Sequence, residues 1–139
     1  HPERFDKVAA MAESAARKAG LSFSRWSEES SLEADIVIID VMGELINFYA
    51  ISDIVILGGA FVPVGGHNPA EVIPFGCRLI SGREIFNQKA MFSSVEGAIF
   101  CDLEMLETAL NQALKGEPLR LKTAVSFRSE EHTSELQSR

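Results

Sequence analysis

Apolar positions along the chain recur in two patterns that alternate with one another. Runs of apolar residues typical of strands occur at 35–40, 53–57, 78–81 and 98–101, and alternation of apolar and polar residues at 21–26 predicts a half-exposed edge strand. Apolar residues at the three- and four-residue spacing of helices occur at 3–18, 42–51, 88–95 and 103–114. A further short helix is expected from Pro69, since proline favours the first turn. The chain is therefore predicted to alternate strands with helices.

Some details of the pattern carry sharper expectations. Gly20 should end the first helix in the left-handed capping conformation. The strand at 35–40, which has a carboxylate at each end, is expected to be buried. The stretch 119–127 is interpreted as the start of another helix. In the helix at 42–51, the residues expected to face inward are Leu45, Phe48 and Tyr49.

Strands that alternate with helices at this spacing form βαβ units. They predict an α/β fold with a Rossmann-like parallel sheet and helices on both faces. Ligands of such sheets bind beyond the carboxyl ends of the strands. Three motifs directly follow predicted strands: Met42–Leu45, Gly58–Glu71 and Ser81–Gln88. The segment His1–Phe5 would join them if a strand precedes it, so this edge of the sheet is predicted to form a nucleotide pocket.

Glycine is paired twice in the loop after the strand at 53–57, at 58–59 and again at 65–66, directly before His67-Asn-Pro69. Glycine permits a positive φ and lets the backbone approach a ligand closely. Free N–H groups at a following helix start would attract an anion. We interpret the loop as a cradle for the phosphate and sugar of a nucleotide, with an ordinary tight turn as the alternative. Its spacing matches neither the Walker loop nor the dinucleotide fingerprint.

Three polar residues near the end of this loop each have two interpretations. Asn68 stands where a helix N-cap is expected, so capping competes with ligand binding. Glu71 either accepts hydrogen bonds from the two hydroxyls of a ribose or only interacts with the helix dipole. His67 is either a functional residue, as a general base or a hydrogen-bond donor to a sugar, or a simple loop residue. No partner with metal-ligand spacing accompanies it, so no metal site is expected.

Positive charges and a second helix start lie near the same predicted sheet edge. Arg4 is a candidate phosphate contact, because a guanidinium binds such groups bidentately, or else a solvated residue of the first helical turn. Gly43 and Glu44 precede a helix and would form a second anion-facing helix start. Arg83 adds a further positive charge, with a plain surface position as the alternative.

Composition narrows the class of protein. The net charge of −7 argues against a nucleic-acid binder, which normally carries a basic stripe. No apolar run reaches the roughly 18 residues of a membrane span, and no signal peptide is recognised. Cys77 and Cys101 are expected to be buried free thiols in a reducing compartment. These features together predict a cytoplasmic α/β protein.

Both ends of the chain affect how its domains are assigned. The sequence begins at His1 without a methionine, and residues 128–139 have almost no apolar residue. That stretch resembles the translation of a sequencing-adapter oligonucleotide and is expected to be a non-native or disordered tail. Residues 1–127 are assigned to one nucleotide-sugar-binding Rossmann-like domain, expected to be a fragment truncated at its N-terminal side.

Four motifs, in this order, resemble the C-terminal half of bacterial 3-deoxy-D-manno-octulosonic acid (Kdo) transferases. The Gly58–Glu71 block is specific, and His1-Pro-Glu-Arg-Phe5 is supportive. Met42-Gly-Glu-Leu45 alone would be weak, and Phe86-Asn87 completes the set. The resemblance covers about residues 1–125. It implies a GT-B fold, in which two Rossmann-like domains face each other across a cleft and this chain is the second.

The resemblance also implies a function and a set of site residues. The family transfers Kdo from CMP-Kdo to the lipid A precursor at the cytoplasmic face of the inner membrane, without a metal or other cofactor. The phosphate and sugar of the donor would be surrounded by Arg4, Gly43, Glu44, Gly65, Gly66, His67 and Asn68. Glu71 would hold the ribose, and Asn87 is also assigned to the substrate site.

The chain departs from the family pattern in two respects. Glu84 stands where the family usually has a histidine before the Phe-Asn pair, so an anion replaces a possible cation. The catalytic base and the acceptor surface are expected in an N-terminal domain outside this sequence, so no catalytic residue is assigned and the fragment is expected to be inactive alone. The alternatives are another GT-B transferase or epimerase that uses a UDP- or GDP-sugar, and a non-enzymatic nucleotide-binding regulatory module.

Overall fold

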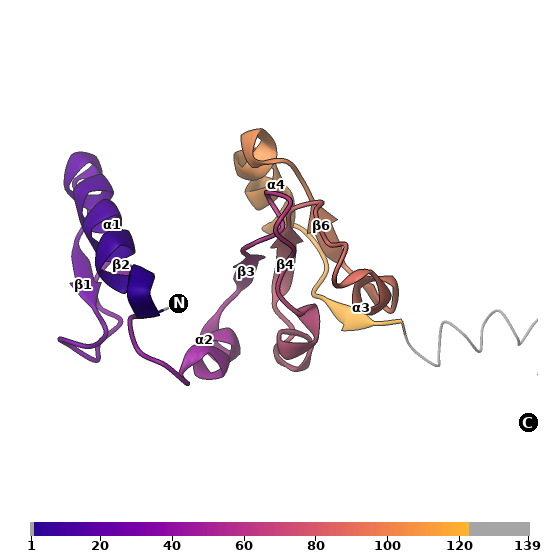
Figure 1. Cartoon of the computed structure of the whole chain (residues 1–139), viewed down its shortest axis with the longest axis horizontal. Coiled ribbons are helices and arrows are strands. Elements are labelled where there is room, and N and C mark those ends of the chain that lie inside the picture. Colours follow the sequence, from indigo (N-terminus) through magenta and orange to yellow (C-terminus); the bar gives the residue numbers. More distant parts are fainter. Residues whose placement is uncertain (1, 123–139) are drawn as a thin grey trace, which may run out of the picture. The chain divides into compact units, whose positions relative to one another are not determined.

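The computed structural model describes residues 2–122 (Figure 1). Expectations for residues 123–139, including the tail at 128–139, lie outside the described part of the chain. The chain divides into two compact units, His1–Phe48 and Tyr49–Arg139, and each is described by itself.

The first unit is a parallel strand pair covered by one long helix. It contains η1 (Pro2–Arg4), α1 (Phe5–Ala19), β1 (Phe23–Arg25) and β2 (Ile36–Ile38). Figure 1 shows α1 lying along β1 and β2, and α1 buries Ala9 and Ala16. Small alanines allow the helix to lie close to the strands. Gly20 ends α1 at φ 72°, as its position predicts.

The second unit is built on a three-stranded parallel sheet. The sheet has the order β3 (Ile54–Leu57), β4 (Arg78–Ser81) and β6 (Ala98–Phe100). Its helical segments are η2 (Pro69–Glu71), η3 (Ile73–Phe75), α3 (Lys89–Ser93), η4 (Leu103–Met105) and α4 (Leu106–Ala113). A separate antiparallel pair joins β5 (Val95–Glu96) to β7 (Arg120–Leu121). α2 (Leu45–Ile51) spans the boundary between the two units.

Apolar side chains are buried on both faces of the three-stranded sheet. On one face, Leu79 of β4 packs in a cluster with Val72 and Phe92. On the other, Ile80 packs with Ala109 and Ala113 of α4. Successive residues of a strand point to opposite faces, which is why neighbours on β4 enter different clusters. The predicted α/β class, with parallel strands and helices on both faces of the sheet, is confirmed.

Several local predictions are wrong, and each has a physical reason. The chain after Pro69 forms two three-residue 3-10 turns in place of one helix, because Pro74 lacks the N–H that a continuing helix needs. Strand β2 is only half-buried, since a two-stranded pair offers little cover. Leu45 is 53% exposed, so it does not face inward. Residues 120–121, expected in a helix, pair with β5 as a strand.

Candidate functional site

The glycine loop adopts a backbone that only glycine accepts easily. Gly59 and Gly65 have φ angles of 85° and 91°. A Cβ on Gly59 would strike the carbonyl oxygen of Gly65, and a Cβ on Gly65 would lie 2.8 Å from Oδ1 of Asn87. The two glycine pairs therefore fold the loop tightly back on itself and against the chain that follows β4. The positive φ angles agree with the prediction, while the close approach to a ligand stays a prediction.

Asn87 holds the loop through a pair of hydrogen bonds with one residue. Its Oδ1 accepts from the backbone N–H of Gly66 at 3.0 Å, and its Nδ2 donates to the Gly66 carbonyl at 3.0 Å. β3 and β4 are parallel neighbours, so the loops after their carboxyl ends meet. The structure thus brings together the Gly58–Glu71 and Phe86-Asn87 motifs, which are far apart in the sequence.

The segment after the loop does not offer the helix start that was expected. Asn68 does act as an N-cap, with its Oδ1 accepting from the Ala70 N–H at 2.9 Å. The turn it caps, however, is only three residues long. A helix dipole needs many aligned peptide units. This short turn therefore supports neither an anion-attracting helix end nor the interpretation of Glu71 as a partner of a helix dipole.

Two candidate ligand contacts remain exposed beside the loop, His67 and Glu71. Glu71 lies near the buried phenol of Tyr49. Burial raises the pKa of Tyr49, and the negative charge of Glu71 acts in the same direction. An exposed carboxylate on a short, capped turn is held in place and still accessible, which suits an acceptor for paired hydroxyls.

The candidates in the first unit lie around the carboxyl end of β2 and the start of α1. Arg4 lines a hollow of about 380 Å³ together with Phe5, Val8, Ile38 and Ile39. The lining is apolar except for Arg4, which is its one charged residue. Arg4 therefore lies beside the carboxyl end of β2, within its own unit.

Gly43 and Glu44 precede α2. Gly43 has a φ of 82°, and a Cβ added to it would meet no heavy atom within 4 Å, so its turn needs glycine for its conformation and not for space. One carboxylate oxygen of Glu44 accepts a hydrogen bond from Asn47 at 3.1 Å. α2 is only seven residues long, so it does not supply the second anion-facing helix start that was expected.

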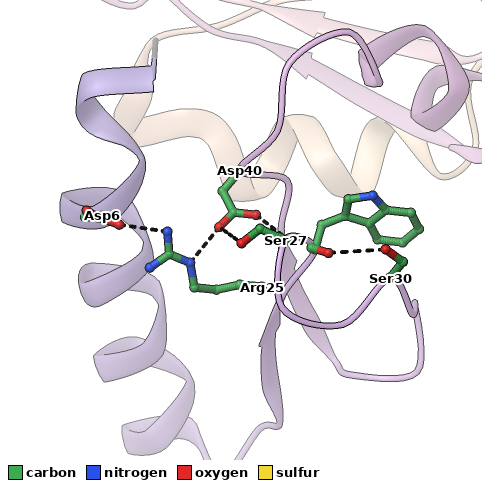
Figure 2. A network of polar contacts seen from close by, with 6 residues as sticks. Asp6, Arg25, Ser27, Ser30 and Asp40 are labelled. Carbon is green, nitrogen blue, oxygen red and sulfur yellow. Dashed lines mark hydrogen bonds and ion pairs between the residues drawn. The ribbon is translucent and has the colours of Figure 1, made fainter.

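A buried carboxylate that sequence analysis did not assign lies at the end of β2 (Figure 2). Oδ2 of Asp40 accepts from Nε of Arg25 at 2.7 Å and from the Ser27 hydroxyl at 2.6 Å, while Oδ1 accepts from the Ser27 N–H at 2.8 Å. Arg25 also donates to Asp6 at 2.8 Å. The only signal in the sequence was the carboxylate at each end of the strand at 35–40.

These contacts shift the titration of Asp40. The Ser27 hydroxyl, followed by the Ser27 N–H and the Arg25 guanidinium, lowers the pKa of Asp40 to about 2, although burial acts in the opposite direction. Asp40 therefore carries a full negative charge at neutral pH. Its hydrogen bonds are satisfied within the protein, which makes it a structural anchor rather than a ligand contact.

A second hollow lies at the carboxyl ends of the strands of the second unit. It measures about 500 Å³ and its charged lining residues are Arg83, Glu84, Asp102 and Glu104. The Arg83 guanidinium pairs with Asp102 at 3.3 Å. The extra positive charge expected at Arg83 is therefore balanced, and with Glu84 present this hollow is acidic overall.

Three further observations concern only residues 2–122. Within that range no group of three or more His, Cys, Asp or Glu side chains is arranged to hold a metal ion. The helices described there are all too short or too polar to cross a membrane. Cys77 and Cys101 are buried free thiols, as predicted.

No family model matches the chain. It is 35% identical over 127 residues to the 3-deoxy-D-manno-octulosonic acid transferase of Haemophilus influenzae and 34% identical over 126 residues to that of Bordetella pertussis. Each match covers 86% of this chain but only 29% and 28% of those proteins, so the chain spans under a third of the relatives' length.

A solved structure resembles the chain in fold as well. The crystal structure of the C-terminal CMP-Kdo binding domain of WaaA from Acinetobacter baumannii matches with a TM-score of 0.68 at 26% identity. The match covers 83% of this chain and 61% of that one. Sequence and fold agree, and the chain belongs to the 3-deoxy-D-manno-octulosonic acid transferase family, of whose C-terminal domain it represents a part.

Proposed function

We propose that this chain binds the donor substrate of a Kdo transferase and holds the CMP part of CMP-Kdo. The observation that carries the proposal is the fold similarity to a domain described as CMP-Kdo binding. The glycine loop supports it, because Asn87 and two positive-φ glycines hold its backbone in one conformation beyond the carboxyl ends of β3 and β4. A backbone fixed in this way needs no ordering when a ligand binds.

The local geometry of each unit supports a set of proposed contacts. In the second unit, the loop at 65–68 meets the phosphate and sugar, and the exposed Glu71 accepts from the ribose hydroxyls. In the first unit, Arg4 pairs with phosphate, and Gly43 and Glu44 contribute the turn before α2. Glu71 is the sharpest assignment, because its alternative as a partner of a helix dipole has no long helix behind it.

The activity of the whole protein is part of the same proposal. It transfers Kdo to the lipid A precursor at the cytoplasmic face of the inner membrane, without a metal. The catalytic base and the acceptor surface are expected in the part of the relatives that this chain does not cover. This chain by itself is expected to bind the donor nucleotide and to lack transferase activity.

Nucleotide binding to the chain tests the proposal directly. Isothermal titration with CMP, UMP and GMP, each with and without EDTA, should show binding of CMP that is tighter than that of the other two and unchanged by the chelator. Equal binding of UMP or GMP would favour a different nucleotide sugar. A folded sample that binds none of the three would reject the proposal, and loss of CMP binding in EDTA would reject its metal-independent part.

Substitution of Glu71 tests the ribose contact. Glu71→Gln should weaken CMP binding by roughly 1–3 kcal/mol, the range for a hydrogen bond to a charged group. Glu107→Gln, at an exposed position of α4, is the matched control and should leave the affinity unchanged. An unchanged CMP affinity in Glu71→Gln, with a lower unfolding temperature, would show that this carboxylate is structural.

A further inference from the structure

The segment from Asp40 to Phe48, which carries Gly43 and Glu44, is held at both ends by three consecutive residues. These are Arg25, which ends β1, and Trp26 and Ser27, which follow it directly. Their contacts with the two ends of the segment lie within the first unit.

At the first end, Asp40 is fixed by two of the three residues. Its side chain is 1% exposed and accepts hydrogen bonds from both Arg25 and Ser27 (Figure 2). Register explains the meeting, because Arg25 lies opposite Ile38 in the parallel pair and Asp40 follows two residues later. Both oxygens of the carboxylate have donors, so the start of the segment has one well-defined position.

At the other end, Phe48 packs edge-on against Trp26. The ring centroids are 5.0 Å apart and the ring planes meet at 89°. This is a favoured geometry for an aromatic pair. Trp26 is itself anchored, because its backbone N–H donates to the carbonyl of Ile38 at 2.9 Å.

Between these two fixed ends the segment is open. Met42 is 71% exposed, and a Cβ on Gly43 would meet no heavy atom within 4 Å. The middle of the segment is therefore accessible to a ligand, while its ends cannot move without breaking buried or aromatic contacts. A binding turn of this kind loses little conformational freedom when its ligand arrives.

We propose that Arg25, Trp26 and Ser27 form a positioning clamp that holds the Gly43–Glu44 turn ready for the donor nucleotide. The inference rests on the proposed function, since it assumes that this turn contacts the donor. The clamp residues act through Asp40 and Phe48 and are not themselves ligand contacts.

The ion pair between Arg25 and Asp6 is not part of the clamp. The Asp6 side chain is 93% exposed, and exposed ion pairs contribute little to stability. Asp6→Asn therefore serves as the matched control. It removes a contact of the same arginine but leaves Asp40 and Ser27 untouched.

Ser27 offers the cleanest test, because a conservative variant can restore its hydroxyl. Ser27→Ala should weaken CMP binding about 3- to 10-fold, the penalty of ordering a loosened turn. Ser27→Thr, which keeps the hydroxyl, and Asp6→Asn should both bind CMP as the unsubstituted chain does. Affinities are compared at a temperature where every variant is folded, so that stability does not enter the measurement.

Trp26 is the chain's single tryptophan and reports on the clamp without any label. Ser27→Ala and Asp40→Asn should increase quenching of its fluorescence by acrylamide, whereas Ser27→Thr and Asp6→Asn should not. CMP affinity or Trp26 quenching unchanged in folded Ser27→Ala would overturn the clamp but leave the proposed function standing. Absence of CMP binding by the unsubstituted chain would instead reject the proposed function, and the clamp's role with it.

Discussion

The two units of this chain are stabilised by different kinds of contact. In the second, Val72, Leu79 and Ile80 are completely buried in apolar clusters on the two faces of a sheet. In the first, the strands are only half-buried, and the most enclosed polar group is the carboxylate of Asp40. Apolar packing responds to side-chain volume, whereas a carboxylate held by charged and polar donors responds to protonation.

The first unit uses the same device at both ends of its strand pair. Before β2, Asp35 accepts from the Ser22 N–H at 2.9 Å and from the Ser22 hydroxyl at 3.0 Å. After β2, Asp40 accepts from the N–H and hydroxyl of Ser27. Serine–aspartate pairs thus close the two ends of a short parallel pair that has little apolar surface to bury.

The largest effect is expected from removing apolar volume in the second unit. Leu79→Ala should lower its free energy of unfolding by about 2–5 kcal/mol, because Leu79 is 0% exposed in the middle of the sheet. Chemical denaturation followed by far-UV circular dichroism measures the loss. Leu114→Ala, at a position that is 62% exposed, should change the free energy of unfolding by less than about 0.5 kcal/mol. Similar losses in the two variants would contradict apolar burial as the source of stability in the second unit.

A smaller effect is expected in the glycine loop. Gly65→Ala forces a side chain into a positive φ and against Asn87, so it should cost roughly 1–3 kcal/mol of stability and weaken CMP binding. Gly20→Ala is the matched control, since Gly20 also has a positive φ but nothing lies within 4 Å of its Cβ position. Only the first variant should affect nucleotide affinity. If both variants weaken CMP binding, or if neither does, the contact with Asn87 does not determine the conformation of the loop.

The smallest of the expected effects is the loss of stability of the first unit in acid. It is also the effect most specific to that unit. The pKa of Asp40 is lowered to about 2, and that of Asp35 is lowered by its bonds from Ser22. A carboxyl with a depressed folded-state pKa contributes its full stability above its unfolded pKa, near 4, and loses it as the pH falls toward the folded value. Stability of the first unit should therefore fall between about pH 4 and pH 2.

Trp26 emission during denaturation at pH 7, 4, 3 and 2 follows this loss. Asp40→Asn has no charge to lose at this position, so it should be less stable than the unsubstituted chain at pH 7 and show a flatter dependence on pH. An equally steep acid response in Asp40→Asn would place the titrating group elsewhere.

Much of the fold was accessible from the pattern of residues. The alternation of strand and helix patterns predicted the α/β class, the three strands of the parallel sheet in the second unit, and the cap at Gly20. The paired glycines correctly marked the loop with positive φ angles. These features are local, because a backbone period or a left-handed φ depends on a few neighbouring residues.

The errors arose where the local pattern was ambiguous. Pro69 favours a helix start, but Pro74 stops the helix five residues later, so 3-10 turns form. Leu45 fits the apolar stripe of α2 and is nevertheless exposed. A stripe of apolar residues indicates which side chains share one face of a helix. It does not indicate how much of that face other elements bury.

The sequence by itself determined the order of the main helices and parallel strands, the glycines of the loop and the family to which the chain belongs. Only the tertiary structure decided that Asn87 forms hydrogen bonds with Gly66 and that Arg25 and Ser27 donate to Asp40. The same is true of the packing of Trp26 against Phe48. The physical reason is the range of these contacts. A hydrogen bond between residues 13 to 21 positions apart depends on which strands lie side by side and in which register, and no local period encodes that.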